Sequence, residues 1–539
     1  MASRRPRVAI IGAGMAGLAA ANRLQTAASH LLDLVVVEGG SRIGGRISSS
    51  VFCGDRVELG ATWIHGIEGS PVHKIARDNN LLHSRGQPWE WMHGMPQDPV
   101  TLAEGTHELD PSLVEPISNL FQNLINDIRG KSVDEDGVTS EIVKRLAGKY
   151  SGAGNNSVGS FLRDGLDAYW EITKDQKDTA GDLSRRSLEE GVFRLHENIQ
   201  RSYSASDDLG TLDFDAERVY QMLPGEEITI AGGYSGVIEF LARALPAGII
   251  QLNMKVDKIE WQLGDEDSHE CGPVKLHFSD SSVLTADHVI VTVSLGVLKR
   301  GIIPGQEIFS PPLPDFKNRA ISRLGYGLVN KAFLQVVDCD NQLGDNDLEL
   351  SFLQMVFHSR DSKSKDPEIP DWIRKTPLLY PIYRNSRVLL SWFAGKEALE
   401  LESLGKDDIT KGFSITTSKL MMPKSNGLIL PINCRKSCSR VPDGKILRFG
   451  DVLRTQWGTD PLFLGSYSYV AVGSSLDDMD VLAEPLPENK NNLDSTKKLQ
   501  ILFAGEATDR THYSTTHGAY FSGLREADRL LEHYNCAAL

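Results

Sequence analysis

Arg7-Val8-Ala9-Ile10-Ile11-Gly12-Ala13-Gly14-Met15-Ala16-Gly17 is the stretch that decides the fold. After Arg7 the residues Val8–Ile11 are apolar, so that Arg7–Ile11 is predicted to be a buried strand, and Gly12–Gly17 has the spacing G-x-G-x-x-G. Helical character follows in Leu18–Leu24, and Leu34–Val37 reads as a second buried strand. A strand, a glycine turn, a helix and a parallel strand form the βαβ unit that binds dinucleotides.

Each glycine of this turn has a separate task. Gly12 permits the sharp turn out of the strand, Gly14 lets the backbone approach a pyrophosphate, and Gly17 allows close packing of helix on sheet. The helix N-terminus, with Ala16 in its first turn, offers unpaired N–H groups to the phosphates. Glu38 ends the second strand, where a carboxylate accepts hydrogen bonds from ribose hydroxyls and repels a 2′-phosphate, so NADP is disfavoured.

The next run separates FAD from NAD. It reads Glu38-Gly39-Gly40-Ser41-Arg42-Ile43-Gly44-Gly45-Arg46 and resembles the E-x(3)-R-x-G-G-R run of the flavin amine oxidase family. The resemblance implies non-covalently bound FAD, with Gly39 and Gly45 close to the cofactor. Arg42 and Arg46 can neutralise the pyrophosphate or hold an edge of the flavin.

A second signature lies near the C-terminus. The pieces Phe503–Thr508 and Thr515–Ala519 resemble the family's second FAD segment, followed by a helix expected over Gly518–Glu532. The resemblance places Glu506 at the ribityl–phosphate portion and Thr515 and Thr516 near the flavin pyrimidine. It adds four more cofactor contacts: Val256, Trp457, Gly505 and Ala519. The chain has no cysteine between Cys438 and Cys536, and this argues against the covalent flavin link of the related monoamine oxidases.

The substrate site is predicted from a third segment, Leu59-Gly60-Ala61-Thr62-Trp63-Ile64-His65-Gly66, which resembles the polyamine oxidase branch of the family. The resemblance places His65 beside the flavin, hydrogen-bonded to a substrate amine. It assigns the residues before His65 to the cofactor, and Trp63 to the substrate as well: Gly60, Ala61, Thr62 and Trp63.

Lys331 matches the family lysine that holds a water against flavin N5, and its apolar neighbours favour a buried ammonium. Tyr467 is the aromatic residue expected to line the substrate channel. Thr515 stands where some relatives carry a second aromatic, which predicts a wider tunnel. A polyamine also needs anions along this tunnel, and Glu197 is the first candidate, followed by Asp207 and Asp208.

At 539 residues the chain is expected to form two domains, or one large domain with a substantial insertion. The predicted fold is α/β, or α+β overall: a Rossmann-like FAD-binding domain of the glutathione-reductase type, interleaved with a substrate domain of mixed sheet and helices. The expected segments are 1–75, 228–325 and 471–539 for the FAD-binding domain, with 76–227 (helices) and 326–470 (sheet) for the substrate domain.

The formal net charge of −15 argues against nucleic-acid binding and would attract a cationic small molecule. Six scattered cysteines fit a reducing compartment, and the Cys434/Cys438 pair has no partners that would complete a zinc site. No apolar run is long enough for a membrane span, and the first strand begins too early for a signal peptide. A cytoplasmic protein is expected. The final four residues, from Cys536, formally match a prenylation box without a supporting polybasic stretch.

The chemistry implied by the resemblance is oxidation of the carbon next to a secondary amine of spermine or thermospermine. Hydride transfer to the flavin, imine hydrolysis to an aminoaldehyde and a shorter polyamine, and reoxidation by O2 to H2O2 complete the expected reaction. Three alternatives stay open: a dehydrogenase with another electron acceptor, an enzyme resembling histone-lysine demethylases, and a non-catalytic FAD-binding scaffold. The sequence leaves the preferred polyamine, the bond cleaved and the oligomeric state undecided.

Overall fold

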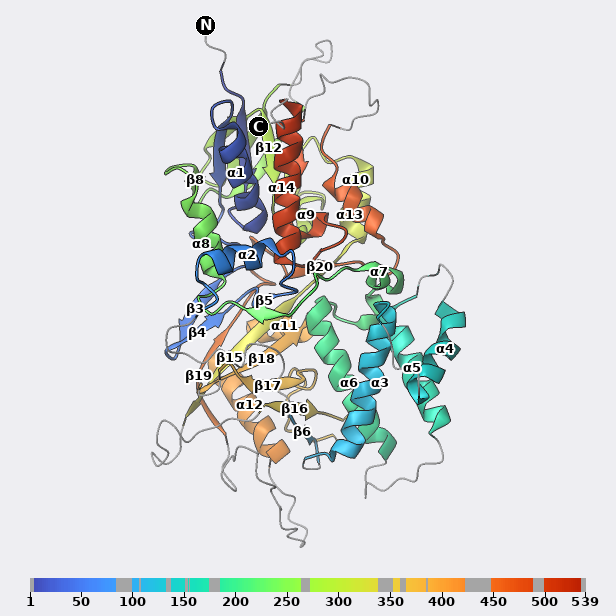
Figure 1. The fold of residues 1–539 in the computed structure, drawn as a ribbon. Coiled ribbons are helices and arrows are strands. Elements are labelled where there is room, and N and C mark those ends of the chain that lie inside the picture. Colours follow the sequence, from blue (N-terminus) through green and yellow to red (C-terminus); the bar gives the residue numbers. More distant parts are fainter. Residues whose placement is uncertain are drawn as a thin grey trace.

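A computed structural model describes residues 4–534 except 84–98, 106–107, 132–136, 151–153, 155, 174–184, 263–271, 338–351, 359–364, 384–385, 422–446 and 488–498. The chain folds into two halves (Figure 1). One half contains a parallel sheet with both termini of the described chain, and the other contains a mixed sheet beside a group of helices. The predictions made for the Cys434/Cys438 pair and for Cys536 concern residues outside the described ones.

The first half is built on a five-stranded parallel sheet. Its strand order is β21 (Ile501–Phe503), β12 (His288–Val291), β1 (Arg7–Ile11), β2 (Asp33–Val37) and β8 (Ile250–Gln251). Val8 and Ile10 of the central strand β1 face one core, and Ala9 and Ile11 face another. Because both faces are covered, the strands are apolar throughout, as parallel sheets require.

Helices cover one face of this sheet and a second sheet lies on the other (Figure 1). The first core contains side chains of α1 (Met15–Ala28), α8 (Ser235–Arg243), α2 (Pro71–Asp78) and α14 (Thr516–His533). The second core includes an antiparallel hairpin system of β11 (Val283–Ala286), β10 (Val274–Phe278) and β9 (Val256–Glu260), with β13 (Phe309–Ser310) parallel to β9. Helices α9 (Leu295–Gly301), α10 (Asp315–Arg323) and α13 (Leu476–Ala483) complete that side.

The second half has a six-stranded sheet. Its order is β19 (Arg448–Arg454), β15 (Val329–Val337), β18 (Val388–Ala394), β17 (Leu378–Pro381), β16 (Leu353–Val356) and β6 (Val100–Ala103). The helices α11 (Gly395–Ser403) and α12 (Lys406–Met421) pack on it. The neighbouring helical group has its own core and consists of α3 (Pro111–Ile128), α4 (Val138–Tyr150), α5 (Val158–Ile172), α6 (Arg185–Ser204), η2 (Leu209–Thr211) and α7 (Phe214–Val219).

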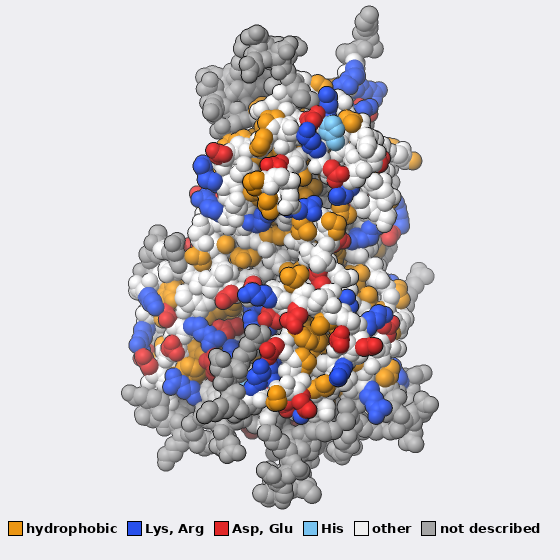
Figure 2. All heavy atoms as spheres, turned by 180° about the vertical axis from the view of Figure 1, so that it is seen from behind, with side chains coloured by type: hydrophobic (Ala, Val, Ile, Leu, Met, Phe, Trp, Pro, Cys, Tyr) orange, Lys and Arg blue, Asp and Glu red, His pale blue; other side chains and the backbone are white. Residues whose placement is uncertain are grey.

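Short pairings join the two halves. They are β3 (Ser49–Phe52) with β4 (Asp55–Glu58), β5 (Trp63–Ile64) with β7 (Ile228–Thr229), and β14 (Gly325–Gly327) with β20 (Tyr467–Tyr469), beside η3 (Glu506–Thr508). The α/β fold expected from the sequence is therefore confirmed. Seen from behind, acidic and basic side chains are interspersed over this face of the molecule (Figure 2). Among the described helices, none combines the length and apolarity that a bilayer span demands.

Candidate active site

A cavity of about 870 Å³ lies between the two halves, within the size range of cofactor and ligand pockets. It collects residues from all three sequence signatures. The predicted residues that line it are Gly12, Gly14, Ala16, Glu38, Gly39, Gly45, Arg46, Gly60, Ala61, Thr62, Trp63, His65, Val256, Lys331, Trp457, Tyr467, Gly505, Glu506, Thr515, Thr516 and Ala519. Segments more than 500 residues apart in the sequence thus share one cavity.

One end of the cavity is suited to a dinucleotide. Gly12 has φ +108°, where an L-residue is strained, and a Cβ on Gly17 would lie 2.0 Å from the Gly12 carbonyl oxygen. Gly17 therefore packs helix on turn and does not itself line the cavity. Gly14 caps α1 without any side-chain hydrogen bond, and the first-turn residues Met15 and Ala16 face the cavity. This helix N-terminus is left for an anion.

Glu38 stands at the same end. Its Oε2 accepts a hydrogen bond from the Ala13 N–H at 2.8 Å, and its Oε1 accepts one from the Gly40 N–H at 2.8 Å. These bonds fix the carboxylate at the cavity wall while each oxygen keeps a further lone pair. A ribose hydroxyl is the group that such a fixed acceptor suits.

The two predicted arginines differ in their roles. Arg42 does not line the cavity, and its guanidinium donates to the carbonyl oxygens of residues 43, 45 and 47 and thereby braces the glycine turn. Arg46 does line it, and its Nη1 donates to Glu506 Oε1 at 2.8 Å and to the Ser466 carbonyl at 2.7 Å. Glu506 also accepts from the N–H groups of Ser468 and Ser514. The first and last FAD signatures are therefore held together at the cavity.

The other end of the cavity meets the N-terminus of α14. Thr515 caps this helix, with its Oγ1 accepting from the Gly518 N–H at 3.0 Å, and Thr516 and Ala519 also line the wall. Trp457 lies near the Gly60 backbone and its Nε1 donates to the Leu59 carbonyl. The cavity thus joins two helix N-termini, one free for a pyrophosphate and one for an anionic ring edge. The donor set fits FAD.

Lys331 is a buried ammonium beside this second end. It lies on β15 directly opposite Trp392 of β18, and its Nζ is 4.4 Å from the centre of the Trp392 ring. Its Nζ donates to the carbonyl oxygens of Glu58 and Gly60, each at 2.7 Å, and to Thr62 Oγ1 at 2.6 Å. Burial lowers the pKa of Lys331 to about 7. All three N–H bonds have a protein acceptor, so a water held by Lys331 requires one of these contacts to open.

His65 and Tyr467 are two of the residues that the sequence predicts to contact the substrate. The Nδ1 of His65 lies 3.2 Å from Glu227 Oε1, in the loop before β7. The hydroxyl of Tyr467 donates to the carbonyl of Ser202 at the end of α6. Both side chains line the cavity, and both are tied to segments that the sequence signatures do not include.

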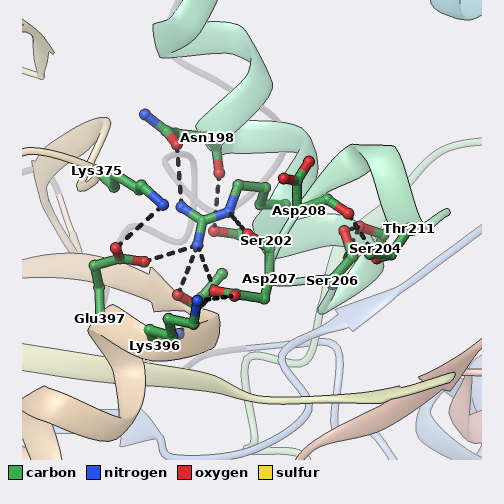
Figure 3. Close-up of polar contacts among 12 residues, drawn as sticks. Asn198, Ser202, Ser204, Ser206, Asp207, Asp208, Thr211, Lys375, Lys396 and Glu397 are labelled. Atoms are coloured by element: carbon green, nitrogen blue, oxygen red, sulfur yellow. Dashed lines mark hydrogen bonds and ion pairs between the residues drawn. The ribbon is translucent and has the colours of Figure 1, made fainter. Parts of the chain in front are cut away.

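The three predicted tunnel anions lie off the described cavity wall. Glu197 is absent from the cavity wall and forms a two-point ion pair with Arg163, whose Nε is 2.7 Å from Glu197 Oε1. Asp207 belongs to a polar network around Arg201, which also includes Glu397 (Figure 3). Asp208 caps η2 through the Gly210 N–H. All three carboxylates are occupied by structural contacts and lie off the described cavity wall.

Glu217 of α7 and Glu227 line the cavity, and Glu217 accepts a hydrogen bond from the Tyr513 hydroxyl at 3.3 Å. Desolvation raises the pKa of Glu217, which is buried. The wall also carries aromatic residues that sequence reasoning missed: Tyr203, Tyr220, Tyr380, Trp392 and Tyr513. The available sequence signals were slight: Glu227 follows the turn Pro224-Gly225, and Tyr513 stands two residues before the Thr515-Thr516 pair.

Comparisons with known proteins identify related chains. The profile of the family described as flavin containing amine oxidoreductase matches residues 15–531. The chain is 51% identical to the probable polyamine oxidase 5 of Arabidopsis thaliana over 99% of both chains. It is 41% identical to polyamine oxidase 1 of Oryza sativa subsp. japonica, over 100% of this chain and 99% of the relative. It is 33% identical to the human peroxisomal N(1)-acetyl-spermine/spermidine oxidase, over 98% of this chain and 95% of the relative.

Proposed function

Because this chain belongs to the flavin-containing amine oxidoreductase family and is an FAD-dependent amine oxidase, we propose that it oxidises polyamines. The observation that carries the proposal is a single cavity that runs from the N-terminus of α1 to that of α14 and includes His65 and Lys331. The similarity to proteins named polyamine oxidases over almost the whole chain supports the same substrate class.

The residues that would hold FAD follow the cavity in order. Glu38 would bind the ribose, the first turn of α1 the pyrophosphate, and Val256 the adenine end. Thr515 and Thr516, at the start of α14, would bind the pyrimidine edge of the ring. When bound, FAD supplies a hydride acceptor for the carbon next to an amine nitrogen and returns the electrons to an oxidant.

The chain's own residues prepare the substrate. Aromatic walls built from Trp392, Tyr380 and Tyr467 exclude water and lower the cost of a neutral amine at the reacting nitrogen. Glu217 and Glu227 supply negative charge for the remaining ammonium groups. Lys331, with its lowered pKa, would exchange a proton within the same enclosure, and it would hold a water only once one of its three protein contacts opens.

The finer proposal is that spermine or thermospermine is oxidised at a carbon next to a secondary nitrogen. Hydrolysis of the resulting imine gives an aminoaldehyde and a shorter polyamine, and O2 is reduced to H2O2. The scarcity of cysteines supports a reducing compartment, and we place the protein in the cytoplasm. A dehydrogenase that uses a different acceptor is the second candidate.

Anaerobic mixing of the purified holoenzyme with spermine tests the substrate class. We expect spermine to bleach the flavin absorbance, whereas a methylated lysine peptide at the same concentration leaves it unchanged. Readmitted air should restore the colour and yield one H2O2 per flavin. If only the peptide bleaches the flavin, the substrate is a methylated lysine of the histone type and not a polyamine. If the colour returns slowly and without H2O2, the result favours the dehydrogenase.

A further inference from the structure

The pair of His65 and Glu227 shares the cavity with the reacting amine of the proposed reaction. Glu227 Oε1 lies 3.2 Å from Nδ1 of His65, and the two side chains are each about one third exposed, at 33% for His65 and 39% for Glu227. Both residues line the cavity. The two residues come from opposite sides of the short β5–β7 pairing, in which Ile64 is the register partner of Ile228, so the backbone holds them face to face.

The charge of Glu227 decides which imidazole nitrogen carries hydrogen. The hydrogen bond with His65 is the main cause that lowers the pKa of Glu227, with Arg129 and Lys131 adding to it. An ionised carboxylate can only accept a hydrogen bond, so Nδ1 of His65 must be the donor. In the neutral ring Nε2 then has the free lone pair, and Nε2 has no hydrogen-bond partner within the described part of the chain.

Other charged and titratable groups around the pair do not replace this arrangement. They are Arg129 and Lys131 after α3, Glu217 of α7, Tyr203 and Tyr220, His512 in the loop before α14, and His517 in the first turn of α14. Burial lowers the pKa of His517 to about 3, so this ring is neutral at physiological pH. Lys331 has all three of its N–H bonds bound by protein acceptors, and Glu217 is hydrogen-bonded to Tyr513.

Resting on the proposed function, we propose that His65 is the base that takes the proton from the substrate ammonium before oxidation, and that Glu227 is its positioning residue. In this step the bond from hydrogen to the substrate nitrogen breaks and a bond from that hydrogen to Nε2 forms. The electron pair stays on the amine, which becomes neutral, and nothing is oxidised or reduced. The Glu227 carboxylate stabilises the imidazolium that results, as an acid does for a catalytic histidine elsewhere.

Substitution of Glu227 tests the pair against a matched neighbour. Glu226 is exposed and absent from the cavity wall, so Glu226→Gln removes the same charge from the same loop. We expect Glu227→Gln to slow anaerobic flavin reduction by spermine about tenfold or more. Glu226→Gln should leave this rate within error of wild type, and Glu227→Asp, which keeps the carboxylate, should restore most of it.

A second measurement does not depend on turnover. In protein labelled with ¹⁵N in its histidines, with the flavin chemically reduced so that spermine cannot react, the His65 signals are assigned by their loss in His65→Gln. We expect a protonated Nδ1 and a bare Nε2 at rest, and protonation of both nitrogens on adding spermine. In Glu227→Gln the second proton should not appear.

The outcomes separate the two proposals. An Nε2 that stays bare with spermine, or a Glu227→Gln variant whose flavin spermine reduces as fast as that of wild type, overturns the role of the pair and leaves polyamine oxidation standing. A wild-type flavin that spermine does not reduce overturns the proposed function and the substrate role of His65 with it.

Discussion

Two buried lysines in different halves of the molecule have nearly the same surroundings. Lys331 donates to three oxygens and lies 4.4 Å from the Trp392 ring centre. Lys317 of α10 donates to the carbonyl oxygens of residues 481, 482 and 484, at the end of α13, and lies 4.2 Å from the Phe503 ring centre. Burial lowers the pKa of each lysine to about 7.

What separates the two lysines is the cavity. The acceptors of Lys331 belong to the segment Glu58–Thr62, and most of this segment lines the cavity. Loss or gain of a proton by Lys331 therefore changes the charge beside the cavity. The acceptors of Lys317 are carbonyl oxygens at a helix C-terminus, where a cation neutralises the negative end of the helix dipole. A perturbed pKa is therefore not evidence of a catalytic role by itself, and only the position of the lysine assigns one.

The largest difference between the two lysines should appear when each is replaced by methionine. Lys331→Met should retain FAD but slow turnover about 10²-fold, because an acid–base group or its water is lost from the site. Stopped-flow anaerobic reduction and reoxidation by O2 are the measurements, with flavin content as the control. Rates equal to wild type in both half-reactions would remove Lys331 from the mechanism.

Lys317→Met should have the opposite effect, lowering the stability of the protein while leaving the rate of flavin reduction almost unchanged. Its thioether can occupy the space over Phe503, but three carbonyl oxygens lose their donor, which costs about 1–3 kcal/mol. We expect a melting temperature lower by a few degrees and a flavin reduction rate within twofold of wild type. A slowed reduction with unchanged stability would reverse the assignment of the two lysines.

A smaller effect, the dependence of stability on pH, tests the same contrast between the two lysines. An unfolded lysine has a pKa near 10.5, and folding lowers that of Lys317 to about 7. Between these values the unfolded chain binds more protons than the folded one, so the lysine's contribution to the free energy of unfolding rises with pH. The stability deficit of Lys317→Met relative to wild type should grow between pH 7 and 8 by up to about 1 kcal/mol. Denaturant titrations at the two pH values measure it, and a constant or shrinking deficit contradicts it.

The sequence predicted the parts of the site whose chemistry is local. The run Gly12–Gly17 requires a turn that only glycines satisfy, and the cofactor end of the cavity follows from it. The burial of Lys331 was also predicted correctly, from its apolar neighbours on one strand. Helix limits were less accurate: α1 begins at Met15, three residues before the expected Leu18, because its first turn is part of the glycine motif.

The parts that depend on distant contacts could not be predicted. Glu197 is held by Arg163 on another helix, and no spacing in the sequence indicates that pair. The partner of His65 is Glu227, 162 positions away, and it becomes visible only when β5 pairs with β7. Lys317 lies in a polar stretch that reads as a solvated helix face, yet it is fully buried.

A crystal structure of the purified holoenzyme with FAD is the most direct measurement. The adenosine should lie at Glu38 and Val256, and the isoalloxazine ring should lie between Lys331 and the start of α14, with Lys317 far from any flavin atom. Density for FAD outside this cavity, or a ring on the Lys317 side of the molecule, would contradict the assignment of the site.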